Sequence, residues 1–149
     1  MIIKSFRGKI KDLAIDTVPL STNDGSTGYQ IKKFQLFPTE PGITKGEHVV
    51  KIYSIPQTTA TGTIDFADNT ILASAYLAMN DAAYYGTDMV TVFENMKFNQ
   101  DIYITHKDNA TGVDVNYYIE LEQVRLDLTE NTVATLKDIR NIEASNDTE

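Results

Sequence analysis

The chain has 149 residues, a length that suits one domain able to bury about two-thirds of its unfolded surface. It contains neither Cys nor Trp, which excludes a zinc–thiolate site, a disulfide framework and a cysteine nucleophile. The formal net charge of −8 argues against nonspecific nucleic-acid binding, which needs a basic surface. The opening MIIKSFRGK lacks the apolar segment of a secretory signal, and the longest apolar run, Ile71–Met79, is too short to cross a membrane. We expect one β-rich domain over residues 1–143 and a flexible polar tail over 144–149, with neither nucleic acid nor membrane as a partner.

Positive charge is concentrated near the start of the chain. Residues 1–51 carry eight Lys or Arg and five Asp or Glu, a net +3, whereas the remaining residues carry five and sixteen, a net −11. The first segment alternates, with Ile2, Phe6 and Ile10 on one face of an expected strand and basic side chains on the other. These basic side chains are the candidate contact with an acidic partner, and the alternative is a solvated sheet face; they are Arg7, Lys9 and Lys11.

Turn-forming residues separate the next segments. The run STNDGSTG lies between two apolar segments and predicts a hairpin. Its Asn23-Asp24-Gly25 matches neither a phosphate-binding glycine loop nor a calcium loop. Residues His48–Ile55 carry apolar side chains on both faces, which predicts a central strand or a strand with one face buried against another subunit. A short strand is expected over Thr63–Phe66.

The segment Ile71–Tyr85 fits two periods. Its apolar residues match the stripe of a helix, which alanine favours, and they equally match the alternation of a strand. Because the chain is otherwise rich in strand patterns, we interpret it as a strand through Met79 followed by a loop. Another strand is expected over Asp88–Glu94.

The clearest pattern is DIYITHKDNATGVDVNYYIELEQVRLDL, residues 101–128. Residues 102–107 alternate, KDNATG supplies turn formers, and apolar residues then recur at every second position from Val113 to Leu121. This pattern predicts a β-hairpin. Beyond Leu121 the apolar residues move to even positions, so a β-bulge is expected near Glu122–Gln123.

The last segment changes period. Thr129 suits an N-cap, and Val133, Leu136 and Ile139 follow at helical spacing, which predicts one amphipathic helix docked through these three residues. The expected fold is therefore all-β, mainly an antiparallel β-sandwich or jelly-roll-like barrel of seven to nine strands, with one C-terminal α-helix.

Few residues suggest chemistry. His48 and His106 lack metal-binding spacing, so a structural role is expected unless the fold brings them together with a carboxylate. Glu120 and Glu122 share a strand face, as paired carboxylates of glycosidases can, but no nucleophile, cofactor loop or activated base accompanies them. We expect no enzyme, no catalytic residue, no metal and no cofactor. The eight tyrosines suit strands and also suit an aromatic platform for sugars or proteins.

Three stretches resemble a known family: the turn and strand STNDGSTGYQIKKFQLFP, the pair FNQDIYITHKD and NYYIELEQVRLDL, and the ending ENTVATLKDIRNIE. Through these stretches the chain resembles a small family of virion proteins of marine tailed bacteriophages. The resemblance covers most of the chain. The resemblance brings no catalytic motif, so no functional residue is carried over. It implies a virion protein rather than an enzyme. We expect this protein on the capsid surface and, during assembly, in the host cytoplasm.

The expected function is that of a capsid decoration or cement protein, which binds and stabilises the lattice of the major capsid protein. Its partners would be the major capsid protein or other virion proteins, and a homo-oligomer is expected, with a trimer favoured. Two alternatives stay open: a neck or tail component of the virion, and a carbohydrate-binding module that acts in host attachment.

Overall fold

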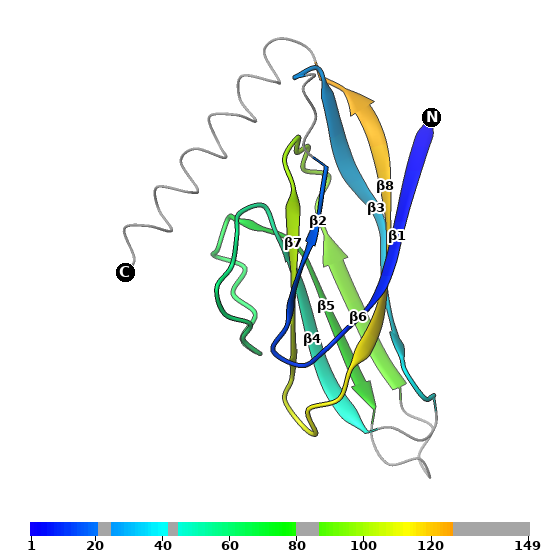
Figure 1. Ribbon diagram of the computed structural model, residues 1–149, viewed down its shortest axis with the longest axis vertical. Coiled ribbons are helices and arrows are strands. Elements are labelled where there is room, and N and C mark those ends of the chain that lie inside the picture. Colours follow the sequence, from blue (N-terminus) through cyan, green and yellow to red (C-terminus); the bar gives the residue numbers. More distant parts are fainter. Residues whose placement is uncertain (21–24, 42–44, 80–86, 127–149) are drawn as a thin grey trace.

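The computed structural model describes residues 1–20, 25–41, 45–79 and 87–126, and in these ranges the chain forms strands and no helix (Figure 1). The predicted all-β class is thereby confirmed. The predicted C-terminal helix with Val133, Leu136 and Ile139, and the tail after it, lie outside the described residues. The strands are β1 (Ile2–Ile10), β2 (Ile15–Val18), β3 (Thr27–Pro38), β4 (Gly46–Tyr53), β5 (Ile71–Met79), β6 (Thr87–Phe93), β7 (Ile102–Asp108) and β8 (Val115–Arg125).

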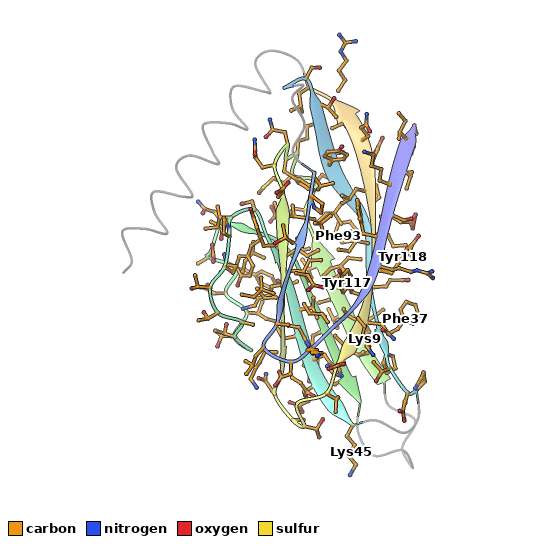
Figure 2. The ribbon with its side chains drawn as sticks, viewed as in Figure 1. Lys9, Phe37, Lys45, Phe93, Tyr117 and Tyr118 are labelled. Atoms are coloured by element: carbon orange, nitrogen blue, oxygen red, sulfur yellow. The ribbon has the colours of Figure 1, made fainter. Side chains whose placement is uncertain are left out.

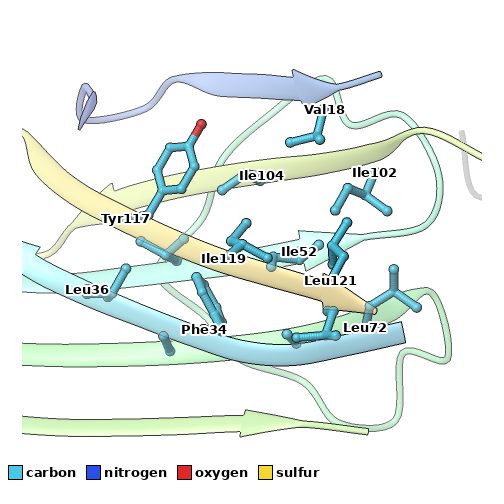
Figure 3. Packing of buried hydrophobic residues seen from close by; sticks show 14 of the residues in the cluster. Val18, Phe34, Leu36, Ile52, Leu72, Ile102, Ile104, Tyr117, Ile119 and Leu121 are labelled. Carbon is cyan, nitrogen blue, oxygen red and sulfur yellow. The ribbon is translucent and has the colours of Figure 1, made fainter. Parts of the chain in front are cut away.

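The strands form two antiparallel sheets that pack face to face. One sheet has three strands in the order β1-β8-β3, and the other has five in the order β2-β7-β4-β5-β6. In β8, Tyr117, Ile119 and Leu121 point inward and are buried, and Figure 3 shows them packed between the layers against residues such as Ile52 and Ile104. The alternation read from the sequence therefore gives each sheet one face in the core.

Both predicted hairpins are wrong. Strand β7 pairs with β2 and β4, whereas β8 pairs with β1 and β3, so KDNATG leads from one sheet to the other. Strands β2 and β3, on either side of STNDGSTG, also belong to different sheets. Turn residues reverse the chain, but the reversal can occur within a sheet or across the core, and the apolar alternation is the same in both cases.

The β-bulge predicted in β8 is absent, and a bulge that the sequence analysis did not predict occurs in its neighbour β3. The ladder between β8 and β1 is continuous from Val115 to Gln123, so the expected break at Glu122–Gln123 is wrong. The register shift lies in β3 between Ile31 and Lys33. There the buried positions change from odd to even, because Tyr29 and Ile31 precede the bulge and Phe34 and Leu36 follow it.

The remaining strand predictions fall within the five-stranded sheet. Strand β4 is central between β7 and β5, as the sequence predicted, and β5 and β6 confirm strands through Met79 and near Asp88–Glu94. The short strand expected over Thr63–Phe66 is absent; this segment belongs to the β4–β5 connection. Lys51 holds that connection, since its Nζ donates to the Thr63 carbonyl at 2.6 Å.

Tyr117 ties the two layers together at the side formed by β1 and β2. Its hydroxyl donates to Asp16 of β2 at 3.2 Å, and burial together with that carboxylate raises the pKa of Tyr117 to about 12, so the hydroxyl stays a donor. Gly8 of β1 pairs with Tyr117, and a Cβ added there would lie 2.7 Å from the hydroxyl oxygen. The ring can reach Asp16 because residue 8 has no side chain.

Substituting Gly8→Ala is expected to destabilise the protein by about 1–3 kcal/mol, because the Tyr117 ring must move from its bonded position. Ser5→Ala, at an exposed position of the same strand, is the control and should change the free energy of unfolding by under about 0.5 kcal/mol. Chemical denaturation measures both. In a double variant with Tyr117→Leu, the added cost of Gly8→Ala should disappear; equal costs in both backgrounds would refute the contact.

Candidate functional site

The outer face of the three-stranded sheet gathers basic, aromatic and amide side chains. Directly paired residues point to the same side of a sheet, so the register places side chains of β1, β8 and β3 in rows. One row is Arg7, Tyr118 and Gln35, and the next is Lys9, Asn116 and Phe37. We call this surface, together with Lys33, the basic face; its members are Arg7, Lys9, Lys33, Gln35, Phe37, Asn116 and Tyr118.

The two sheets carry opposite charge. The strands of the three-stranded sheet contain six Lys or Arg and two Glu, a net charge of +4, in a protein whose net charge is −8. The strands of the five-stranded sheet contain two Lys and four Asp or Glu, a net charge of −2. The excess of positive charge near the start of the chain is therefore gathered on one layer rather than mixed by folding.

An open groove of about 710 Å³ lies on the basic face. Phe37 is 51% exposed in it (Figure 2). The Lys33 ammonium lies 5.9 Å from the ring centre of Tyr118. The lining combines cations, the exposed ring of Phe37, the half-buried ring of Tyr118 and amides, which together can bind a partner that has both apolar and anionic groups. The lining residues are Arg7, Gly8, Lys33, Gln35, Phe37, Asn116, Tyr117 and Tyr118.

The structure separates the three basic residues singled out in the sequence. Arg7 and Lys9 are exposed and share the outer face of β1, where neither has an ion-pair partner among the described residues. Lys11 is also exposed, but it follows the end of β1 and lies in the connection to β2. Arg7 and Lys9 thus form the part of the predicted contact that belongs to the basic face.

The two glutamates of β8 are engaged by lysines of β3. Lys32 Nζ lies 3.0 Å from Glu122, and Lys33 Nζ lies 3.9 Å from Glu120. Each carboxylate therefore faces a lysine ammonium across the β8–β3 pair. Over the described ranges no group of three or more His, Asp or Glu side chains could hold a metal ion.

The two histidines, far apart in sequence, meet in the fold. His48 of β4 and His106 of β7 are fully buried, and Nδ1 of His48 lies 2.9 Å from Nε2 of His106. Nδ1 of His106 lies 3.0 Å from the carbonyl oxygen of Lys11. The neighbouring strands bring the rings together because His48 pairs with Asp108, two residues beyond His106, and both side chains point inward.

Asp108 anchors the turn that leads from β7 to β8. Its Oδ1 accepts from the amides of Glu47 at 3.0 Å and Ala110 at 2.9 Å. Its Oδ2 accepts from the Val113 amide at 2.9 Å and the Thr111 hydroxyl at 3.0 Å. Burial alone would raise the pKa of Asp108, but these donors outweigh burial and hold the pKa well below its usual range.

Comparison of the chain with protein-family models and with curated proteins finds no match. In the part of the chain that the structure describes, no helix is long and apolar enough to cross a membrane. Sequence reasoning missed Phe37, Asn116 and Tyr118 as groove residues. Their signal was present, since they alternate with the buried positions of β3 and β8, but it requires the pairing of β8 with β1 and β3.

Substituting Asp108→Asn is expected to lower the free energy of unfolding at pH 7 by about 2–4 kcal/mol, because an amide nitrogen cannot accept from the Val113 amide. Since the pKa of Asp108 is lowered by folding, its contribution is fully present above about pH 4 and is lost as the pH falls further. Denaturation curves from pH 7 to pH 3 should show the variant and the natural protein converging. Asp114→Asn, with the same charge change, is the control; an equal loss there would contradict this role of Asp108.

Proposed function

We propose that the protein is a structural component of a tailed-phage virion, most simply a capsid decoration protein bound to the lattice of the major capsid protein. The observation that carries the proposal is the basic face, a cationic and partly apolar surface on a protein of net charge −8. A sandwich with one such face is suited to docking on an acidic surface. The amphipathic helix expected over residues 129–143 belongs to the same proposal, as a further packing element or a contact with a neighbouring copy.

Repetition makes weak contacts sufficient. One exposed ion pair contributes about 0.2–1 kcal/mol, so Arg7 and Lys9 alone cannot hold a partner tightly. The exposed ring of Phe37 adds apolar area between these charges. In a symmetric shell each copy, or each oligomer of copies, repeats the contact, and binding through several sites at once raises the overall affinity. The proposal therefore expects a homo-oligomer, with a trimer favoured, on the capsid surface.

The rival position in the virion is the neck or tail. A decoration protein and a neck protein use similar contacts but differ in number, because a shell offers hundreds of equivalent positions and a neck ring offers about six or twelve. Quantitative mass spectrometry of purified particles, with the major capsid protein as internal standard, separates the two. About six or twelve copies per particle would indicate a neck or tail protein instead of a decoration protein. Absence from the particle would refute a role in the virion.

Substituting Arg7→Gln and Lys9→Gln together is expected to weaken binding to particles about 2- to 30-fold, because two exposed ion pairs are lost. A variant with Thr17→Glu and Asn69→Glu has the same change of net charge at exposed positions away from the basic face and should bind normally. Binding is measured by sedimentation with particles at several salt concentrations, and added salt should release the natural protein before it unfolds. If the Gln variant binds normally but has a lower free energy of unfolding, Arg7 and Lys9 stabilise the fold and do not contact the particle.

A carbohydrate-binding function is the second candidate, favoured by the exposed ring of Phe37 beside the amides of Asn116 and Gln35. Sugar rings stack on aromatic faces, and amides match their hydroxyl groups because they both donate and accept. A glycan array with purified protein tests it. The prediction is binding that Phe37→Ala abolishes and that Phe66→Ala, at another exposed phenylalanine, leaves intact. No binding at millimolar sugar would remove this candidate.

A further inference from the structure

The connection from β1 to β2 is fastened to β7 at the histidine pair. The Leu13 amide donates to the His106 carbonyl at 2.9 Å, and the His106 amide donates to the Ala14 carbonyl at 3.2 Å. The Asp108 amide donates to Asp12 Oδ1 at 2.7 Å. Without these hydrogen bonds the connection would have little to stabilise it. Leu13 is 59% exposed, and its φ of 65° is a left-handed conformation that is strained for a leucine.

The hydrogen bonds of the pair fix where its protons lie. The Lys11 carbonyl can only accept, so Nδ1 of His106 carries a proton. One further proton is shared between Nδ1 of His48 and Nε2 of His106, which are 2.9 Å apart. These two protons are the full complement of two neutral rings. Three of the four ring nitrogens then take part in a hydrogen bond. The fourth, Nε2 of His48, carries no proton.

Any added proton must therefore reside on Nε2 of His48, whichever ring carries the formal charge. That nitrogen is buried and has no hydrogen-bond partner among the described residues. The site is also tight, because a Cβ placed on Gly46 would lie 2.5 Å from it. Protonation would create a buried N–H and a buried charge with no acceptor, which is strongly unfavourable unless water reaches the site.

The charged groups around the pair act in both directions. Burial lowers the pKa of His48 and His106 lowers it further, whereas the carboxylates of Asp108 and Asp12 act to raise it, and the net pKa is below the usual value. Lys107 Nζ lies 3.8 Å from Asp12 and offsets part of that carboxylate. Strand β5, which places Leu77 opposite His48, contains no charged residue. The neutral pair is thus the favoured state of the fold.

We propose that the histidine pair is an acid-sensitive latch, in which one proton added at Nε2 of His48 releases the Lys11–Ala14 connection from β7 and loosens the adjoining end of β1. The connection opens first because it is short, irregular and strained, and its opening admits water to His48. Lys9 of the basic face lies at this end of β1. The latch goes beyond the proposed function and holds whatever partner the basic face binds.

Histidine NMR of the full-length protein tests the proton assignment. At pH 7.5 both rings should be the Nδ1–H tautomer with Nε2 of His48 bare. On acidification the new proton should appear on His48 with an apparent pKa below 6.5. Amide exchange of Leu13 and His106, corrected for its intrinsic pH dependence, should rise at least tenfold between pH 7.5 and pH 5, while exchange of Ala73–Leu77 in β5 stays constant. A proton on Nε2 of His48 at pH 7.5, or protonation without faster exchange of Leu13, would overturn the latch.

The variant His48→Asn provides the matched comparison. The shorter side chain can reach the position of Nδ1 but has no group at the position of Nε2, and its oxygen can accept from Nε2 of a protonated His106, so acidification adds no proton at the bare site beside Gly46. The tenfold rise in exchange of Leu13 should be absent in this variant. An equal rise would overturn the proposal. The NMR titration of the natural protein decides the matter independently if the variant does not fold.

Discussion

The pairing of β8 with both β1 and β3 is the constraint on which the rest of the structure depends. The inward residues of β8 fill the core, and Ile119 and Leu121 are wholly buried there. The same strict alternation turns Asn116 and Tyr118 outward, between the basic side chains of β1 and the aromatic and amide side chains of β3. Strand β8 thus contributes side chains to the hydrophobic core and to the floor of the groove. A shift in the register of β8 would therefore disrupt the core and the candidate docking surface together.

A second constraint is the way the chain passes between layers. The links from β1 to β2, from β2 to β3, from β3 to β4 and from β7 to β8 all change sheet, so neighbouring segments in the sequence face each other across the core. Two of these connections are held in place by hydrogen bonds to polar side chains. Asp108 gathers the amides of the β7–β8 turn, while His106 and Asp12 fasten the β1–β2 connection. Polar anchoring of this kind makes the end of the sandwich near the histidine pair sensitive to protonation in a way that an apolar core is not.

Alternation predicted most of the strands but not their partners. It located β1, β7 and β8, because burial on one face imposes a period of two whichever strands are neighbours. Strand β4 was predicted from apolar residues on both faces, and Ile71–Met79, which fits a helix and a strand equally well, was assigned as a strand because the rest of the chain is rich in strand patterns. It failed for the turns, since Asn, Asp and Gly reverse the chain within a sheet and between sheets alike. It placed the bulge in the wrong strand. The apolar residues move from odd to even positions after Leu121, which suggested a bulge there, but the same move between Ile31 and Phe34 marks the actual bulge.

The candidate sites show the same division. Arg7 and Lys9 were identifiable because they alternate in one strand with the half-buried Phe6 and the buried Ile10. The groove depends on three strands from distant parts of the chain, and the contact between His48 and His106 depends on the register of β4 against β7. Neither arrangement leaves a local pattern in the sequence. Long-range pairing is therefore the information that the structure adds, and both proposals rest on it.

Hydroxyl-radical footprinting of the protein, alone and mixed with phage particles, is the most direct test of the proposal that the basic face is the docking surface. Phe37 and Tyr118 should be oxidised in the free protein and become protected on the particle. Phe66, on the β4–β5 connection, should keep its reactivity. Protection of Phe66 with Phe37 and Tyr118 unchanged would place the partner elsewhere and contradict the account.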